Sequence, residues 1–210
     1  MTVLAIGPLT DLACLALNHP DTVGNIGRVV ALVGSAPQSP MTFDGTTMRD
    51  FNFLMDPRAE QVILEQTDIP FTAITFEASS SAAAPTSRIL QLRRSTSERA
   101  RFFGEASVDY VQSWEKSIGT EKPMWDAAAA WYLLRPEAFI CAEGGFDLAL
   151  GETPSGGLVN TAAAPLEGVE LHDWFSPDYT RTRRVTACTG FVSDDAEQVY
   201  LDSVFAALGA

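Results

Sequence analysis

The chain has 210 residues, 46% of them hydrophobic, and a formal net charge of −13 from 27 acidic and 14 basic residues. This length suits one domain with a substantial core. So acidic a surface repels phosphate groups, which argues against nucleic acid and anionic membranes as partners but is compatible with a neutral ligand or a divalent cation. A solvated surface that serves solubility accounts for most of the charge. No apolar run approaches the roughly 20 residues of a membrane span.

Three cysteines, Cys14, Cys141 and Cys188, lie far apart, each in an apolar stretch. An odd number of cysteines at wide spacing argues against a disulfide framework or a zinc site. We therefore expect small core residues in a reduced compartment, with the cytoplasm as the default location.

Strand and helix patterns alternate in the first part of the chain. Residues 2–6 form a continuous apolar run, which is typical of a buried parallel strand. Residues 9–18 repeat apolar side chains at i, i+3, i+4 and i+7, which predicts an amphipathic helix. A second strand is predicted at residues 28–33, and a loop rich in Gly, Ser and Pro follows over residues 34–47.

The middle of the chain continues this alternation. Asp56-Pro57 is typical of a helix cap followed by the first helical residue, and a third strand is predicted at residues 71–76. The Ser/Ala-rich residues 78–84 are of low complexity, and we expect them to be mobile. A helical region is predicted over residues 85–117, with a break near residues 95–97.

The last part of the chain combines helices with short strands. A helix is predicted to begin at residue 125 and to end before residue 135. Strand signals and glycines over residues 140–157 indicate a hairpin or a small sheet extension. A strand over residues 184–192 precedes a helix capped by Ser193, Asp194 or Asp195, whose buried stripe is Leu201, Val204, Phe205 and Leu208. The alternation predicts an α/β fold, and without repeats or long linkers it predicts a single domain over residues 1–210.

A tight turn is predicted directly after the first strand, at Gly7-Pro8-Leu9-Thr10. Such a turn lies at the carboxyl edge of an open α/β sheet, where these folds bind ligands. An ordinary connection between a strand and a helix explains the same residues.

Asp50 and Asn52 flank the apolar Phe51 at the end of a long loop. A carboxylate and a carboxamide placed in this way can accept hydrogen bonds from, and donate them to, vicinal sugar hydroxyls. The alternative is that both side chains satisfy the loop backbone and the start of the next helix.

Trp125 and Asp126 open the run Met124-Trp125-Asp126-Ala127-Ala128-Ala129-Ala130-Trp131. A flat indole beside a carboxylate suits a site that stacks on a base while it holds a sugar or a metal ion. Alternatively, Asp126 caps the helix and Trp125 packs its entry as a hydrophobic staple.

In their order and spacing these segments resemble the nucleoside hydrolase family over nearly the whole chain. The resemblance implies a Rossmann-like open, mostly parallel sheet with helices on both faces, a bound calcium ion, and hydrolysis of the N-glycosidic bond of ribonucleosides. The segments that carry it are Gly7-Pro8-Leu9-Thr10-Asp11-Leu12-Ala13, Leu32-Val33-Gly34, Asp50-Phe51-Asn52-Phe53 with Asp56-Pro57, Trp125-Asp126-Ala127-Ala128-Ala129 and Leu134-Arg135-Pro136.

Carried over to this sequence, the resemblance assigns roles to individual residues. Asp126 matches a calcium-binding aspartate, and Ile6 matches the residue whose main-chain carbonyl binds the same ion. Asn52 matches an asparagine that holds ribose hydroxyls. Asp50 stands where the family usually has a glutamate, and Asp44 or Ser39 falls near a further ribose-binding asparagine.

Trp125 resembles the tryptophan of the purine-specific branch of the family, where other members have a histidine suited to protonating the leaving group. Stacking on an electron-rich indole makes a purine ring more basic as it departs. The resemblance therefore implies a preference for purine nucleosides.

One part of the family pattern has no counterpart in residues 1–210. The signature Asp-x-Asp-x-x-x-Asp-Asp, which supplies the general base and the other calcium ligands, would precede Met1, so we expect no catalytic residue within this chain. A first hypothesis is that an upstream reading frame or a separate polypeptide completes a purine-preferring hydrolase. A second is a relative without catalysis that binds nucleosides or a protein partner, and a third is an unrelated α/β binding module. The incomplete sheet predicts a homo-oligomer, or a partner chain at its N-terminal edge.

Overall fold

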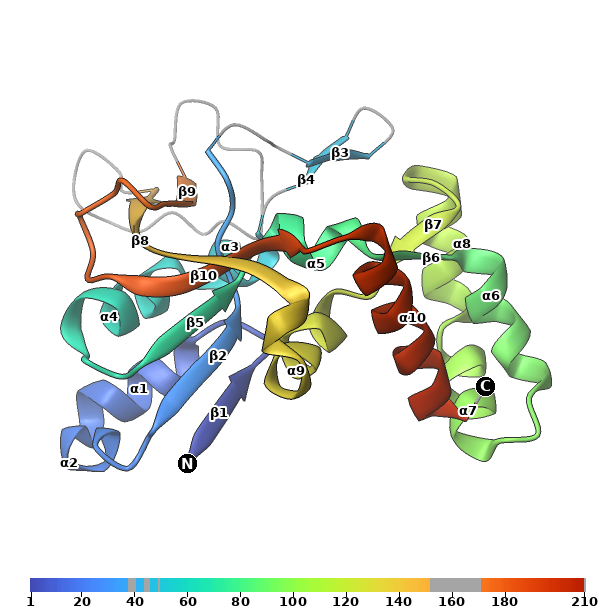
Figure 1. Cartoon of the computed structure of the whole chain (residues 1–210), viewed down its shortest axis with the longest axis horizontal. Coiled ribbons are helices and arrows are strands. Elements are labelled where there is room, and N and C mark those ends of the chain that lie inside the picture. Colours follow the sequence, from blue (N-terminus) through green and yellow to red (C-terminus); the bar gives the residue numbers. More distant parts are fainter. Residues whose placement is uncertain (38–40, 44–45, 49, 152–170, 210) are drawn as a thin grey trace.

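The computed structural model of the chain describes residues 1–37, 41–43, 46–48, 50–151 and 171–209. Figure 1 shows a twisted sheet with helices on both of its faces and a group of helices at one end. The predicted α/β fold is confirmed. None of the described helices combines the length and the apolar character needed to cross a membrane.

The main sheet has six strands in the order β1-β2-β5-β10-β8-β9. The first four are parallel to one another, and β8 and β9 continue the sheet in antiparallel pairing. Their bounds are β1 Thr2–Ala5, β2 Arg28–Leu32, β5 Phe71–Ile74, β10 Val185–Phe191, β8 Phe139–Leu150 and β9 Leu171–Ser176. Of the two alternatives predicted for residues 140–157, a hairpin or a small sheet extension, the described part confirms the sheet extension, because β8 is one long strand that pairs with β9 and continues the sheet.

Alternation along β2 divides the core into two layers. Val29 and Ala31 face α1 (Thr10–Asn18) and α4 (Pro57–Gln66), whereas Val30 and Leu32 face the opposite layer. That layer consists of α5 (Phe76–Ser81), α9 (Trp125–Leu134) and α10 (Asp194–Leu208). A strand that is apolar on both faces is expected where helices cover both sides of a parallel sheet.

The helical region predicted over residues 85–117 is confirmed, and so is its break. It consists of α6 (Thr86–Gln91), the 3-10 turn η1 (Leu92–Arg94), α7 (Glu98–Ala106) and α8 (Val108–Ser117), and Ser97 caps α7 by accepting a hydrogen bond from the Ala100 N–H. These helices lie beside α10 at the end of the molecule remote from α1 (Figure 1).

Short elements complete the described fold, and the predicted caps hold. Asp56 accepts a hydrogen bond from the Ala59 N–H, and Ser193 accepts one from the Ala196 N–H. In α10, Leu201 and Phe205 are buried, whereas Val204 and Leu208 are partly buried. The short elements are α2 Pro20–Val23, β3 Met41–Phe43, β4 Thr46–Met48, α3 Phe51–Met55, β6 Ala83–Pro85, β7 Glu121–Pro123 and η2 Pro136–Ala138.

Two predictions about burial and order are wrong. Among the described residues β1 is an edge strand whose one partner is β2, and Leu4 within it and Ile6 just after it are 39% and 47% exposed. The Ser/Ala-rich residues 78–84 are ordered in α5 and β6, and Ala78, Ala82 and Ala84 are buried. Small side chains allow this segment to pack closely in the core beneath α9.

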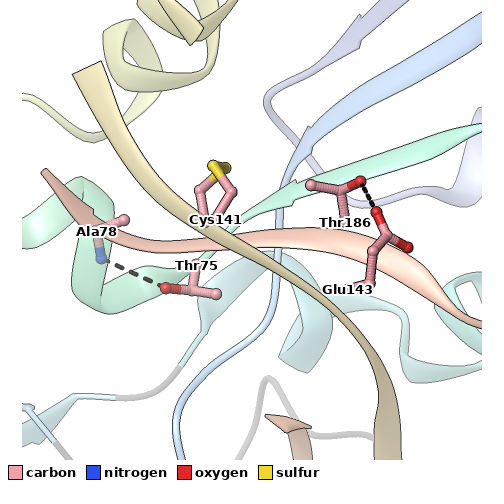
Figure 2. Close-up of a disulfide and its surroundings, with 6 residues drawn as sticks. Thr75, Ala78, Cys141, Glu143 and Thr186 are labelled. Carbon is pink, nitrogen blue, oxygen red and sulfur yellow. Dashed lines mark hydrogen bonds between the residues drawn. A yellow bond between two sulfur atoms is a disulfide. The ribbon is translucent and has the colours of Figure 1, made fainter. Parts of the chain in front are cut away.

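The prediction that all three cysteines are reduced is also wrong. Cys141 in β8 and Cys188 in β10 form a disulfide (Figure 2), and only Cys14, which is exposed, is free. The two residues are direct cross-strand partners, two positions along the strands from the pair in which Thr186 donates a hydrogen bond to Glu143. The antiparallel register therefore brings together cysteines that lie 47 residues apart in sequence. Cys141 and Cys188 therefore do not indicate a reduced compartment.

Candidate functional site

Five of the predicted site residues line one cavity of about 420 Å³. It lies where the chain leaves β1 and β2 and where α3 and α9 begin. Its lining residues are Ile6, Gly7, Pro8, Leu32, Asp50, Phe51, Asn52, Phe76, Trp125 and Asp126. The segments that were singled out in the sequence thus converge in space. Asp44 and Ser39 lie outside the described residues.

Asp50 is buried, and its carboxylate accepts hydrogen bonds from backbone N–H groups. One oxygen accepts from Gly34 N at 2.7 Å, and the other accepts from Asn52 N at 2.8 Å and from Phe53 N at 3.2 Å. Asp50 is therefore the N-cap of α3. The alternative in which it satisfies the loop backbone and the helix start describes these bonds correctly.

Asp50 also belongs to a cluster of buried acids that the sequence analysis missed. Asp173 of β9 accepts a hydrogen bond from Gly34 N as well, at 2.7 Å, and Glu60 of α4 is only 1% exposed. Burial raises the pKa of Asp50 to about 6. Burial and the neighbouring carboxylates raise the pKa of Asp173 and of Glu60 well above the usual range.

Asn52 is half-buried, and its side chain is anchored to the sheet. Its Nδ2 donates a hydrogen bond to the carbonyl of Leu32 at 2.8 Å, at the end of β2. This bond fixes the carboxamide at the wall of the cavity, where a pre-oriented amide suits a polar ligand.

Trp125 is the first residue of α9 and is held from several sides. Its Nε1 donates to Ser80 Oγ at 2.7 Å, and its ring stacks near Phe76 with centroids 6.1 Å apart. The ring of Trp114 meets it edge-on at 5.4 Å. Trp125 thus packs the entry of the helix, as the alternative proposed, and also lines the cavity.

Asp126 does not cap α9. The N-cap is Met124, which makes no side-chain capping bond, and Asp126 follows in the exposed first turn of the helix. Partial desolvation of its carboxyl raises the pKa of Asp126, and the charge of Lys122 opposes this shift. Its carboxylate therefore lies at the helix N-terminus and accepts no hydrogen bond from the described residues.

The two residues that the resemblance assigns to a calcium ion lie at the same cavity. Asp126 and Ile6 line the same cavity and offer a carboxylate and a main-chain carbonyl, both oxygen donors of the kind that calcium prefers. Calcium takes six to eight oxygens, and the described residues contain no group of three or more His, Cys, Asp or Glu side chains that could hold a metal ion. These two donors do not form a complete site by themselves.

A second cavity, of about 750 Å³, shares Trp125 and Asp126 with the first. It lies among α7, α8, α9 and α10, and its walls are mainly apolar. Lys122 of β7 also lines it and is only 9% exposed. The sequence analysis missed this residue because one lysine between Glu121 and Pro123 forms no motif.

The chain is similar in sequence and in fold to nucleoside hydrolases. A family model described as inosine-uridine preferring nucleoside hydrolase matches residues 1–196. The pyrimidine-specific ribonucleoside hydrolase RihA of Shewanella woodyi is 25% identical to the chain over 146 residues, which are 68% of this chain and 45% of that protein.

Two solved structures share the fold. A plant nucleoside hydrolase, the PpNRh1 enzyme, superposes with a TM-score of 0.70 and 16% identity over 95% of this chain and 60% of its own. A purine-preferring ribonucleoside hydrolase from Gardnerella vaginalis gives a TM-score of 0.65 and 15% identity over 95% and 58%. The chain thus spans less than two thirds of the length of each of these relatives.

Proposed function

The chain belongs to the inosine-uridine preferring nucleoside hydrolase family, and from this premise we propose that it forms part of a site that hydrolyses purine ribonucleosides to base and ribose. The observation that carries the proposal is the convergence of Ile6, Asn52, Trp125 and Asp126 on one cavity. In this proposal Asn52 contacts the ribose, Trp125 contacts the base, and Asp126 with the Ile6 carbonyl contributes to a calcium site.

The purine preference rests on Trp125. An aromatic ring at the edge of the cavity supplies a large apolar contact, which a bicyclic base fills better than a pyrimidine does. The names of the relatives cover both specificities, since one is pyrimidine-specific and another purine-preferring. Only a direct comparison of inosine with uridine decides between them.

We further propose that residues outside 1–210 complete the site and supply its catalytic aspartates. The support is an edge of β1 that no other described strand pairs with, together with an apolar cavity of about 490 Å³ between β1 and α1 that is lined by Val3, Leu4, Leu12 and Ile26 among others. This edge adjoins the candidate site through Gly7 and Pro8, which line both cavities. An added strand with its helix would cover the edge and bring further oxygen ligands to Ile6 and Asp126.

A second candidate function is nucleoside binding without catalysis. The hydrogen bonds of Asp50 favour it, because both carboxylate oxygens already accept backbone N–H groups. A side chain committed to the start of α3 reaches a sugar hydroxyl less readily than a longer glutamate.

One experiment tests both candidates. Ribose release from inosine and from uridine, and the binding of inosine, are measured in the presence of calcium. The proteins are the 210-residue chain and the chain joined to any upstream-encoded segment, each as the parent and as Trp125→Ala. Release that favours inosine, and that falls in the variant, supports hydrolysis. Inosine binding without ribose release supports the second candidate, and the absence of both contradicts the proposal.

A further inference from the structure

Lys122 is a buried cation surrounded by aromatic rings. Its Nζ lies 3.6 Å from the ring centroid of Trp125, 4.9 Å from that of Trp114 and 5.4 Å from that of Tyr110. The ammonium donates one hydrogen bond, to the carbonyl of Pro123 at 2.7 Å. An ammonium has three N–H donors, and the carbonyl of Pro123 is the one acceptor that the described residues offer to Lys122.

Trp125 lines both cavities, and the residue beside its ring differs between them. Phe76 lines the smaller cavity, whereas Lys122 lines the larger one. At 3.6 Å the ammonium stands at about the height above the indole that a stacked base would occupy. A base that stacks on this face must take the place of the ammonium.

A lysine side chain can make this exchange, because its charge is carried on a flexible four-carbon stem. A cation–π contact is weaker than a hydrogen bond from a charged donor to a good acceptor. The exchange is therefore favourable when the base presents acceptor atoms to Nζ. It is unfavourable when the base presents an N–H group there.

Resting on the proposed function, we propose that Lys122 is a specificity-determining residue that selects 6-oxopurine bases over 6-aminopurine bases in the larger cavity. A 6-oxopurine carries two neighbouring acceptors, O6 and N7, on one edge, whereas adenine carries an acceptor and an amino donor there. The ammonium is complementary to the first edge and repels the amino group of the second.

Two further observations support this assignment. Trp131 lines the same cavity, and its Nε1 is a buried donor without an acceptor among the described residues. The charged and titratable groups around Lys122 are Asp126 of α9 and Tyr110 of α8. Burial lowers the pKa of Lys122 to about 8 and the charge of Asp126 opposes this shift, so the ammonium form prevails at neutral pH.

The chain contains only two lysines, which makes the test specific. Lys116 is exposed on α8 and serves as the matched control. The protein is labelled with 13C at lysine Cε, and the probes are hypoxanthine and adenine, which have no glycosidic bond to hydrolyse. In the free protein the Lys122 signal should be shifted by the ring currents of the three aromatic rings. The Lys116→Met variant lacks the signal of Lys116, and the signal that remains is therefore that of Lys122.

The proposal expects hypoxanthine to move the Lys122 signal, and to bind about tenfold or more tightly than adenine, which is what a charged hydrogen bond contributes. Lys122→Met should remove this preference, and Lys116→Met should keep it. A Lys122 signal that neither base moves, or equal affinities in the parent, would overturn the inference. Ribose release without a Lys122 response contradicts this inference alone, whereas a response without ribose release contradicts only the hydrolysis.

Discussion

Asp50 and Asp173 accept hydrogen bonds from the same backbone N–H group, that of Gly34, each at 2.7 Å. Two carboxylates that share one donor in a buried place cannot both be ionised at low cost, and Glu60 adds a third buried acid. This cluster lies directly behind the wall of the candidate site, to which Asp50 belongs. Gly34 and the start of α3 are therefore bound to carboxylates that are not all ionised at low cost.

The buried acids predict that the chain is more stable in mild acid than at neutral pH. The pKa of Asp50 rises to about 6, and those of Asp173 and Glu60 rise well above their usual range. A raised folded-state pKa means that the folded state holds its protons more tightly, so stability falls as pH rises from about 4 through the folded pKa. For Asp50 alone, the free energy of unfolding should fall by about 2–3 kcal/mol.

Asp173→Asn tests this origin of the pH dependence. An asparagine keeps an acceptor for Gly34 and gains a permanent donor toward Asp50, so the variant should unfold at a higher temperature than the parent at pH 8 and at the same temperature at pH 5. Asp178→Asn, an exposed aspartate beyond β9, is the control for the loss of one negative charge. Equal pH profiles of thermal unfolding for the parent and Asp173→Asn would contradict the account.

Thiol titration tests the disulfide between β8 and β10. The denatured, unreduced chain should contain one reactive thiol, from Cys14, and the reduced chain should contain three. Closing a loop of this length stabilises the fold by up to about 4 kcal/mol in the chain-entropy description, so reduction should lower the unfolding temperature. Cys14→Ser should keep that sensitivity, and Cys141→Ser with Cys188→Ser should abolish it. Three thiols without reduction would refute the disulfide.

Asp126→Asn should weaken calcium binding by the completed protein. The substitution removes one negative charge from an oxygen ligand set, for which a loss of about tenfold or more in affinity is expected. Asp11→Asn is the matched control. Like Asp126, Asp11 is an exposed aspartate in the first turn of a helix, here the helix α1 that follows β1. Calorimetric titration with calcium measures both variants. An unchanged affinity in Asp126→Asn would remove this residue from the proposed metal site.

The exposed edge of β1 predicts self-association of the 210-residue chain. Leu4 is 39% exposed on a strand that, within the described part of the chain, pairs on one side only. Charged residues on edge strands oppose pairing with another chain. Size-exclusion chromatography with light scattering should therefore show oligomers for the parent and a shift toward monomer for Leu4→Lys. A parent that is monomeric at high concentration would count against the prediction.

Much of this fold could be predicted because local patterns agree with the final structure. The apolar runs at β2 and β5 became parallel strands that are buried on both faces, and Asp56 and Ser193 cap the predicted helices. The buried or exposed position of a strand could not be read in this way, because the same apolar run describes both a central strand and the edge strand β1. The prediction that the Ser/Ala-rich segment is mobile was wrong at Ala78, because a close contact between helices also requires small residues.

The candidate site was partly predictable for a related reason. Asn52, Trp125 and Asp126 belong to recognisable segments, and the fold brings these to one cavity. Lys122 and Asp173 have no local signal, because their environment is created by distant elements. The disulfide was hidden in the same way, since only the antiparallel register of β8 and β10 places Cys141 opposite Cys188.

A crystal structure of the completed protein with inosine or its products and calcium tests the central claim most directly. The account predicts the ribose ring in the cavity lined by Asn52, the base in contact with Trp125, and a calcium ion bound by Asp126 and the carbonyl of Ile6. Ligand density at any other place, or a calcium ion that leaves Asp126 and Ile6 unbound, would contradict it.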